Sequence, residues 1–275
     1  MSTFAETIAA AARRLRAAGI ETPERDARRL TAFAAGLAPE RVTLHLRDPF
    51  PAGTALEAAL SARERRQPVA QIIGGRMFCG RMFRVTPDVL DPRPETEELV
   101  AAALEEPFEN ALDLGSGTGC IILTLLAEQP SSHGVGAELS EAALRVARGN
   151  ARRLGIDVCF ILSDWFSAVE GRFDLIVSNP PYISAAEMET LQPETRLWEP
   201  RMALTDEGDG LGAYRTLATG ALAHLVPNGR LLVEIGPEQG AAVSGLFQHA
   251  GLENIRIRPD LDGRDRVVCA RAPAD

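Results

Sequence analysis

The stretch "NIRIRPDLDGRDRVVCAR", residues 254–271, decides how the sheet of this chain must end. Residues 254–259 and 266–271 are rich in isoleucine and valine, which predicts two β-strands. Only "DLDGRD" separates them, whereas a parallel crossover needs about a dozen residues or more. The two strands are therefore predicted to pair antiparallel, as a hairpin at the end of the sheet.

Upstream of this hairpin, from about residue 91, strand-like and helix-like segments alternate. This alternation favours an α/β fold with a mostly parallel sheet and helices on both faces. The predicted strands are 110–115, 133–139, 158–163, 173–178 and 229–236, followed by the two of the hairpin. The predicted helices between them are 119–129, 140–155, 211–225 and 236–251. A seven-stranded Rossmann-like sheet that ends in an antiparallel hairpin resembles the S-adenosylmethionine-dependent methyltransferases, whereas a nicotinamide dehydrogenase would be expected to end differently.

The chain before this region predicts two smaller parts. Residues 1–72 have helical periodicity, with Thr3 and Glu6 spaced as a capping box and Asp26 expected on an outward face, and predict a small helical bundle. Residues 73–90 place apolar residues around glycines, which suits a β-hairpin linker. The predicted domains are therefore a helical bundle over 1–72, a hairpin linker over 73–90 and a large domain over 91–275.

Composition excludes several classes of protein. No apolar run approaches the roughly 18 residues of a membrane span, and the N-terminal residues lack the order of a secretion signal, so we expect a cytoplasmic protein. The cysteines Cys79, Cys120, Cys159 and Cys269 have no C-x-x-C spacing, which indicates free core thiols rather than a disulfide framework or a zinc site.

The net charge of −9 argues against an affinity that rests on neutralising duplex phosphates. It is unevenly distributed, because residues 1–72 hold 11 arginines against 8 acidic residues, while residues 73–275 hold 18 against 30. The helical bundle is thus mildly basic at +3 and the remainder acidic at −12. Such a distribution can orient a macromolecular partner, although it can equally serve solubility alone.

The stretch "LDLGSGTGC", residues 112–120, lies where the first strand of the large domain meets its first helix. Gly115, Gly117 and Gly119 permit a tight turn and let a ligand approach the backbone. Their spacing is G-x-G-x-G, not the G-x-G-x-x-G of dinucleotide-binding proteins, which speaks against NAD or FAD. On its own the motif is a weak signal, since it also suits a turn without a ligand.

Acidic and aromatic residues follow the next two strands. Glu138 can accept hydrogen bonds from both ribose hydroxyls of an adenosine. The alternative is that its charge only stabilises the dipole of the next helix, which Ser140 is already suited to cap. After the following strand, Asp164 can accept from an adenine amino group and Trp165 can pack against the ring. The alternative is a solvated aspartate beside a core tryptophan.

The stretch "SNPPYI", residues 178–183, follows the apolar strand "FDLIV". Two prolines cannot continue a central strand because they lack N–H groups, so the strand must end at Ser178. Asn179 and the Pro180 carbonyl can accept both N–H groups of a planar nitrogen, on which Tyr182 can stack. The glycine loop, Glu138, Asp164 and this loop are all predicted at carboxyl ends of strands, where ligands bind in open α/β sheets.

"DLGSGTG" together with "NPPY" resembles methyltransferases that act on nitrogens conjugated to a planar system. "LDPRPETEELV", "SDWF", "WEPRMALTDEGDGL" and "GRDRVV" narrow the resemblance to the family of peptide chain release factor glutamine N5-methyltransferases, over essentially the whole chain. The resemblance implies a helical N-terminal domain, a hairpin linker and a Rossmann-like catalytic domain. It also implies methyl transfer to the glutamine of the Gly-Gly-Gln loop of class I release factors, with S-adenosylhomocysteine as product and no metal.

The resemblance also implies roles for individual residues. For S-adenosylmethionine, it implies a glycine loop beside the methionine and ribose, formed by Gly115, Ser116, Gly117, Thr118 and Gly119. It further implies Glu138 at the ribose, Asp164 and Trp165 at the adenine, and Asn179 as an additional cofactor-binding residue. Those implied for the substrate glutamine are Asn179, Pro180, Pro181 and Tyr182, of which Asn179, Pro180 and Tyr182 are the expected catalytic residues. Arg93, Glu95 and Thr96 are expected on a loop near the cofactor, with no contact assigned. The basic helical bundle is expected to dock the body of the protein substrate.

Other readings remain open at this point. A ribosomal-protein glutamine methyltransferase shares "NPPY" but resembles "PRSP" where this chain has "PRPETEE". A DNA adenine-N6 methyltransferase would need a base-recognition domain and a basic cleft, neither of which the sequence indicates. A nicotinamide oxidoreductase and a non-catalytic binding protein on the same fold are the remaining alternatives. Neither a stable nucleic-acid partner nor a membrane partner is expected.

Overall fold

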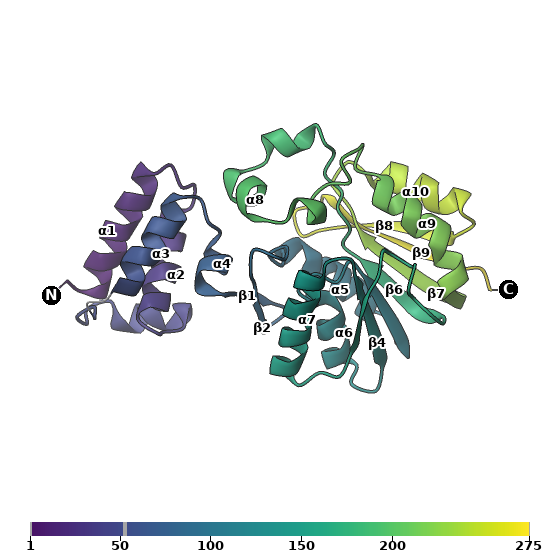
Figure 1. The fold of residues 1–275 in the computed structure, drawn as a ribbon, viewed down its shortest axis with the longest axis horizontal. Helices are drawn as coiled ribbons and strands as arrows, with labels where there is room; N and C mark the ends of the chain where they lie inside the picture. Colours follow the sequence, from purple (N-terminus) through teal and green to yellow (C-terminus); the bar gives the residue numbers. More distant parts are fainter. Residues whose placement is uncertain (1, 52–53, 275) are drawn as a thin grey trace. The chain divides into compact units, whose positions relative to one another are not determined.

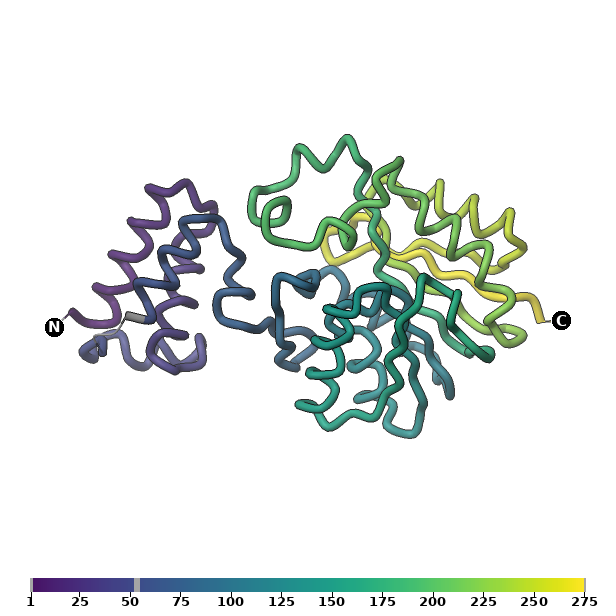
Figure 2. The backbone as a smooth tube through the Cα atoms, in the orientation of Figure 1, coloured from purple at the N-terminus to yellow at the C-terminus, as the bar shows by residue number. Residues whose placement is uncertain are grey.

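The computed structural model describes residues 2–51 and 54–274, and the chain forms two compact units (Figures 1 and 2). The first, here called the helical unit, contains the chain up to Gly75 together with Gln192–Trp198. The second, the sheet unit, contains Arg76–Leu191 and the chain from Glu199 onward. A short segment that follows "NPPY" in sequence thus folds with the N-terminal helices, which the sequence analysis did not anticipate.

The sheet unit contains a seven-stranded sheet in the order β5-β4-β3-β6-β7-β9-β8 (Figure 1). Its strands are β3 (Asn110–Leu114), β4 (His133–Glu138), β5 (Cys159–Leu162), β6 (Phe173–Ser178), β7 (Leu225–Glu234), β8 (Glu253–Pro259) and β9 (Asp265–Arg271). Strands β3 to β7 pair in parallel, whereas β9 pairs antiparallel with both β7 and β8. The predicted fold class and the closing antiparallel hairpin are both confirmed.

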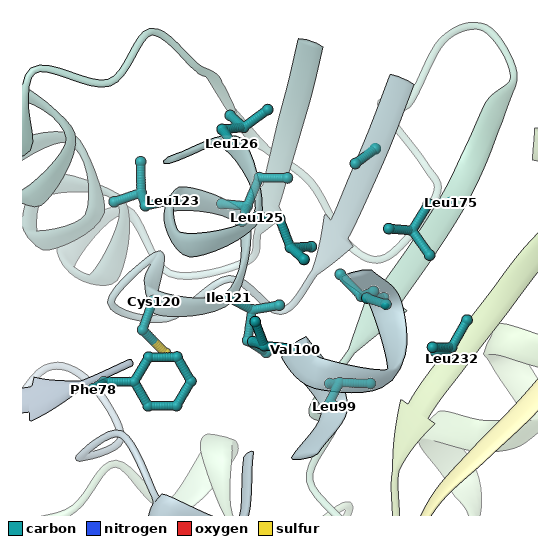
Figure 3. Packing of buried hydrophobic residues seen from close by; sticks show 14 of the residues in the cluster. Phe78, Leu99, Val100, Cys120, Ile121, Leu123, Leu125, Leu126, Leu175 and Leu232 are labelled. Atoms are coloured by element: carbon teal, nitrogen blue, oxygen red, sulfur yellow. The ribbon is translucent and has the colours of Figure 1, made fainter. Parts of the chain in front are cut away.

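Helices cover both faces of this sheet. The helices α5 (Glu97–Leu104), α6 (Cys120–Glu128) and α7 (Glu141–Leu154) share one buried cluster with the sheet, and α9 (Gly212–His224) and α10 (Gly240–His249) share the other. Successive strand residues alternate between the clusters, so Leu175 packs in the first and Ile176 in the second. Figure 3 shows the first cluster, in which Leu125 from α6, Val100 from α5 and Leu175 from β6 are members.

Two further kinds of element complete the sheet unit. Strands β1 (Gly75–Phe78) and β2 (Arg81–Arg84) form a separate two-stranded hairpin, whose Phe78 and Phe83 join the first buried cluster. Three short 3-10 helices are η2 (Pro94–Thr96), η3 (Glu187–Thr190) and η4 (Arg201–Ala203). The aromatic side chains of the hairpin therefore anchor it to the same core that supports α5 and α6.

The helical unit consists of α1 (Phe4–Ala17), α2 (Pro23–Ala34), η1 (Pro39–His45), α3 (Thr54–Glu64), α4 (Val69–Ile73) and α8 (Pro193–Trp198). The predicted capping box is present, because the Thr3 hydroxyl accepts from the Glu6 N–H and the Glu6 carboxylate accepts from the Thr3 N–H. Leu15 and Leu30 are fully buried in the core of this unit.

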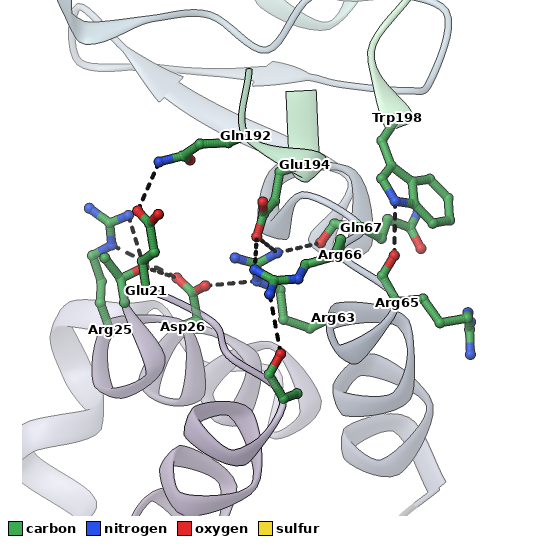
Figure 4. A network of polar contacts seen from close by, with 12 residues as sticks. Glu21, Arg25, Asp26, Arg63, Arg65, Arg66, Gln67, Gln192, Glu194 and Trp198 are labelled. Atoms are coloured by element: carbon green, nitrogen blue, oxygen red, sulfur yellow. Dashed lines mark hydrogen bonds and ion pairs between the residues drawn. The ribbon is translucent and has the colours of Figure 1, made fainter. Parts of the chain in front are cut away.

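The expectation that Asp26 faces outward is wrong. Its side chain is buried, and its Oδ2 lies 2.8 Å from Nε of Arg63, which is itself buried. Arg63 Nη1 lies 2.9 Å from Oε1 of Glu194, so one guanidinium joins two carboxylates from distant parts of the sequence (Figure 4). The helical periodicity could not reveal a partner that lies 37 residues away in the chain.

The same network fixes the segment Gln192–Trp198 within the helical unit (Figure 4). Arg66 adds a second guanidinium 3.3 Å from Glu194, and the Trp198 indole donates a hydrogen bond of 3.0 Å to the Arg65 carbonyl oxygen. At the other end of the segment, the Gln192 amide donates to Glu21 at 2.8 Å. Polar contacts rather than a large apolar face therefore hold α8 to the helical unit.

The cysteines are free, as predicted, but not all lie in the core. Cys120 is buried, Cys79 and Cys269 are half-buried, and Cys159 is exposed because it lies on the edge strand β5. Within the described part of the chain, no helix is long and apolar enough to cross a membrane.

Replacing Arg63 by methionine should reduce the free energy of unfolding by roughly 3 kcal/mol, because the change leaves the buried Asp26 carboxylate without its guanidinium. Arg16→Met is the matched control, since Arg16 and Glu24 form an exposed pair in the same unit and the change should cost less than about 1 kcal/mol. Urea unfolding of both variants measures the difference. Equal effects would contradict the assigned importance of the buried network.

Candidate active site

The pairing of β3 with β6 sets the position of the site. Leu114 and Ser178, the last residues of the two strands, are direct partners in the parallel register. The buried Ser178 hydroxyl also donates a hydrogen bond of 2.7 Å to the Leu114 carbonyl oxygen. The glycine loop and the Asn-Pro-Pro-Tyr loop therefore begin side by side at the carboxyl edge of the sheet, and the strand ends at Ser178 as predicted.

A pocket lies at this edge. The predicted site residues that line it are Gly115, Gly117, Glu138, Asp164, Trp165, Asn179 and Pro181. Residues from η4 and the preceding Pro200 add an apolar wall, with Met202 half-exposed. The structure thus brings together groups from the ends of β3, β4, β5 and β6, as expected for an open α/β sheet.

The remaining residues of the glycine loop do not line this pocket. Ser116 and Thr118 are buried; the Ser116 hydroxyl donates to the Asp113 carbonyl oxygen at 3.0 Å, and the Thr118 hydroxyl accepts from the Cys120 N–H at 3.3 Å. Gly119 has φ +78°, and a Cβ there would lie 3.0 Å from the Phe160 ring. These side chains and this close packing stabilise the loop, so that Gly115 and Gly117 present backbone to the pocket.

Glu138 is held in one orientation by backbone donors. Its Oε2 accepts from the Gly117 N–H and its Oε1 from the Ser140 N–H, both at 2.9 Å. Ser140 caps α7 by accepting from the Ala143 N–H, as predicted. A carboxylate oxygen can accept more than one hydrogen bond, so both Glu138 oxygens can also receive hydroxyl donors from a ligand.

Asn179 has an asymmetric environment. Its Nδ2 donates a hydrogen bond of 3.1 Å to the Thr96 hydroxyl, whereas its Oδ1 is buried without a hydrogen-bond partner among the described residues. Thr96 is the last residue of η2 and is itself buried. The expectation placed Thr96 near the cofactor without a contact, and the structure shows that it contacts the Asn-Pro-Pro-Tyr loop.

The other two residues of that expected group differ from Thr96. Arg93 forms an ion pair with Glu199 at 2.5 Å, and Glu95 is exposed. Burial raises the pKa of Glu199 to about 7, although the Arg93 charge acts in the opposite direction. Neither Arg93 nor Glu95 lines the pocket.

Tyr182 lies against a buried carboxyl group. Its hydroxyl is 3.5 Å from Oε1 of Glu234, the last residue of β7, which has no exposed surface. Burial raises the pKa of Glu234 to about 7. Burial, and to a smaller extent the Glu234 charge, raises the pKa of Tyr182 well above its ordinary value. Sequence reasoning missed Glu234, although a carboxylate within the apolar run "LLVEIG" is a signal that could have found it.

The loop "TDEGDG", residues 205–210, holds the exit of the Asn-Pro-Pro-Tyr loop. The Asp206 carboxylate accepts from the N–H groups of Gly208, Gly210 and Gly212 at 2.7 to 3.0 Å. Gly210 has φ +77°, and a Cβ there would lie 2.4 Å from the Tyr182 carbonyl oxygen. The same carbonyl oxygen accepts from the Gln239 amide at 2.9 Å. Sequence reasoning had assigned no function to Asp206, Gly210 or Gln239.

Among residues 2–51 and 54–274, no group of three or more histidine, cysteine, aspartate or glutamate side chains is placed to hold a metal ion. The polar groups at the sheet edge are instead backbone N–H groups, carboxylates and one amide. Such an arrangement suits a neutral or cationic organic ligand with hydroxyl and amino groups.

Comparison with known proteins gives consistent results. Residues 93–211 match the family model described as "Methyltransferase small domain", and residues 6–74 match "PrmC N-terminal domain". A release factor glutamine methyltransferase of Cereibacter sphaeroides is 60% identical, over 98% of this chain and 99% of that protein. A protein of the same name from Rhodospirillum rubrum is 45% identical, over 95% of this chain and 82% of that protein. Another from Caulobacter vibrioides is 42% identical, over 97% of this chain and 95% of that protein. The chain belongs to the release factor glutamine methyltransferase family.

Solved structures support the fold. A methyltransferase from Pyrococcus furiosus has a TM-score of 0.55 at 16% identity and covers 80% of this chain and 100% of its own. The 16S rRNA N2 G1207 methyltransferase of Thermus thermophilus, in complex with AdoMet and guanosine, has a TM-score of 0.53 at 19% identity and covers 72% of this chain and 49% of its own. The family membership and this fold identify an S-adenosylmethionine-dependent methyltransferase.

The pocket fits S-adenosylmethionine. Glu138 is fixed with acceptor capacity for two ribose hydroxyls. Gly115 and Gly117 have φ values of +76° and +55°, and a Cβ at either position would meet no atom within 4 Å, so the loop backbone is open to a ligand. Asp164 adds an acceptor to the pocket lining, and Trp165 adds an aromatic ring.

Replacing Glu138 by glutamine should weaken S-adenosylmethionine binding about tenfold or more, because the amide nitrogen cannot accept from either a backbone N–H or a ribose hydroxyl. Glu141→Gln is the matched control, since Glu141 is an exposed carboxylate at the first position of α7. Isothermal titration calorimetry with both variants measures the two dissociation constants. Wild-type affinity in Glu138→Gln would rule out the assigned ribose contact.

Proposed function

We propose that this protein transfers a methyl group from S-adenosylmethionine to the side-chain amide nitrogen, N5, of the glutamine in the Gly-Gly-Gln loop of class I peptide chain release factors. The observation that carries the proposal is at Asn179, which lines the pocket and whose buried carbonyl oxygen has no hydrogen-bond partner among the described residues. An acceptor left free in this way suits an N–H donor from a substrate. The 60% identical relative, a release factor glutamine methyltransferase, supports the choice of substrate.

Asn179 and Pro180 are the proposed acceptors for the glutamine amide. An amide nitrogen is a weak nucleophile because its lone pair is delocalised, so catalysis depends on placing it correctly. Asn179 Oδ1 and the Pro180 carbonyl oxygen would accept its two N–H groups, and the consecutive prolines restrict the motion of that carbonyl. Tyr182 is held at its hydroxyl by Glu234 and at its backbone carbonyl oxygen by Gln239, and its ring would pack on the flat face of the amide.

The remaining pocket residues are proposed to hold the methyl donor. Glu138 would bind the ribose hydroxyls, Asp164 and Trp165 would bind the adenine, and the backbone of Gly115 and Gly117 would border the methionine part. S-Adenosylmethionine supplies a methyl group that is bound to a positively charged sulfur. The amide nitrogen would take up this methyl group by displacement, S-adenosylhomocysteine would leave, and the nitrogen would lose one proton to water. The protein's own contribution is orientation of the amide and exclusion of solvent.

The helical unit is proposed to dock the body of the release factor. Its first 72 residues carry a net charge of +3, against −12 for the rest of the chain, so it offers the more basic surface. Because release factors act in translation, we propose that the protein acts in the cytoplasm. Among the described residues, no contact in the site favours a ribosomal protein or DNA as substrate.

Incubation of purified release factor with this protein and S-adenosylmethionine should add one methyl group, about 14 Da, to the Gly-Gly-Gln peptide, as measured by mass spectrometry. A release factor with asparagine in place of that glutamine is the control and should gain none. Methylation of a ribosomal protein or of DNA adenine in parallel reactions, with none on the release factor, would refute the proposed substrate.

Replacing Asn179 by alanine should reduce kcat by roughly a hundredfold, because one acceptor for the substrate amide is lost. The dissociation constant of S-adenosylmethionine should change by less than about threefold, since the proposed adenosine contacts come from other residues. Single-turnover methylation and calorimetry separate the two quantities. Comparable losses in both would contradict the role assigned to Asn179.

A further inference from the structure

A side-chain amide such as that of Asn179 can present either its oxygen or its nitrogen to a ligand, because the two ends are nearly identical in shape. Only the oxygen can accept an N–H group from a substrate glutamine. The inverted orientation would place two donors opposite each other and leave both unpaired. The site therefore needs a device that selects one orientation of Asn179.

Thr96 is placed to make this selection. Its hydroxyl lies 3.1 Å from the Asn179 Nδ2, and its side chain is 2% exposed, so water cannot readily replace it. A hydroxyl carries one proton, and it accepts from Asn179 most effectively when that proton is directed elsewhere. The direction of the Thr96 proton thus decides which end of the Asn179 amide is favoured.

Glu234 supplies the second partner. Its carboxyl group has no exposed surface, and its Oε2 has no hydrogen-bond partner within the described residues. Thr96 lowers the pKa of this carboxyl group, against the larger effect of burial, so its hydroxyl is the candidate donor for the free Oε2. A carboxylate can only accept, so it draws the Thr96 proton toward itself and leaves the Thr96 oxygen free to accept from Asn179.

We propose that Thr96 is a positioning residue, which donates its proton to the Glu234 carboxylate and accepts from the Asn179 amide nitrogen, so that the Asn179 carbonyl oxygen faces the substrate amide. The proposal rests on the proposed function, in which that oxygen accepts from the substrate. Neither Thr96 nor Glu234 touches the substrate in this scheme, and both act only through Asn179 and Tyr182.

The direction of these hydrogen bonds makes the scheme sensitive to pH. Protonated Glu234 would donate to Thr96, whose own proton would then favour the Asn179 oxygen and invert the amide. Several titratable or charged groups either shift the pKa of Glu234 or have their own pKa shifted by its charge. They are Tyr182, Tyr214, Cys120, Arg266, Arg93 and Glu95. Since burial raises the pKa of Glu234 to about 7, its carboxylate form is lost as the pH falls below this value.

The test compares Thr96→Val, which keeps the shape and removes the hydroxyl, with Thr96→Ser, which keeps the hydroxyl. With release factor as substrate, Thr96→Val should lower kcat by roughly tenfold to a hundredfold, with less than about threefold change in the KM for release factor or in S-adenosylmethionine affinity. Thr96→Ser should retain kcat within about threefold. Thr124→Val is the matched control, because Thr124 is equally buried but donates to the Cys120 carbonyl oxygen within α6.

The pH dependence provides an independent readout. Wild-type kcat should fall as the pH drops through about 7, and Thr96→Val should lack this fall because its Asn179 no longer responds to Glu234. Wild-type turnover in Thr96→Val, equal losses in the valine and serine variants, or an unchanged pH profile in Thr96→Val would each overturn the proposal.

Failure of the proposed function gives a different pattern. Wild-type protein would then leave release factor unmodified, and the Asn179 side chain can still be followed by nuclear magnetic resonance of protein labelled with ¹⁵N-asparagine. The Asn179 side-chain N–H signals, identified by their absence in Asn179→Ala, should exchange with solvent faster in Thr96→Val than in wild type and Thr96→Ser. Equal exchange in all three would overturn the positioning role by itself.

Discussion

The parallel pairing of β3 with β6 is the constraint on which the site depends. The chain leaves β3, builds β4 and β5 on one side, and returns to place β6 on the other, so two loops diverge from adjacent strand ends. The Ser178 hydroxyl bonds to the Leu114 carbonyl oxygen at the last pair of this register. A shift by one residue would move Asn179 relative to the glycine loop and turn every β6 side chain to the opposite face.

Burial of polar side chains at this edge of the sheet costs stability, but it fixes the orientation of those side chains. Glu234 and Thr96 lie in the interior, and the Asn179 oxygen has no hydrogen-bond partner among the described residues. Each such polar group would be more stable in water. The surrounding core offsets this cost, since α5, α6 and the hairpin bury Leu99, Leu123 and Phe83 completely. A rigid apolar frame thus allows a few polar side chains to remain in orientations that solvent would otherwise randomise.

Local patterns in the sequence predicted what depends on neighbouring residues. Apolar runs predicted the strands, the short "DLDGRD" predicted the antiparallel hairpin, and the prolines predicted where β6 ends. Glu138 and Asp164 could be placed in one pocket because carboxyl ends of parallel strands share an edge. These inferences need only strand direction and alternation, which are properties of short segments.

The contacts that sequence reasoning missed join residues far apart in the chain. Thr96 meets Asn179 across 83 residues, Gln239 meets Tyr182 across 57, and Arg63 meets Glu194 across 131 positions of sequence. No sequence periodicity reveals such pairs, since each polar residue taken alone is equally well explained by solvent exposure.

The segment Gln192–Trp198 shows the consequence most clearly, because its chain neighbours on both sides belong to the sheet unit. The chain therefore passes between the two units three times, and the residues that follow the last passage, Pro200 and Met202, line the pocket. The stretch of chain that lines the pocket therefore begins shortly after a segment that folds with the helical unit.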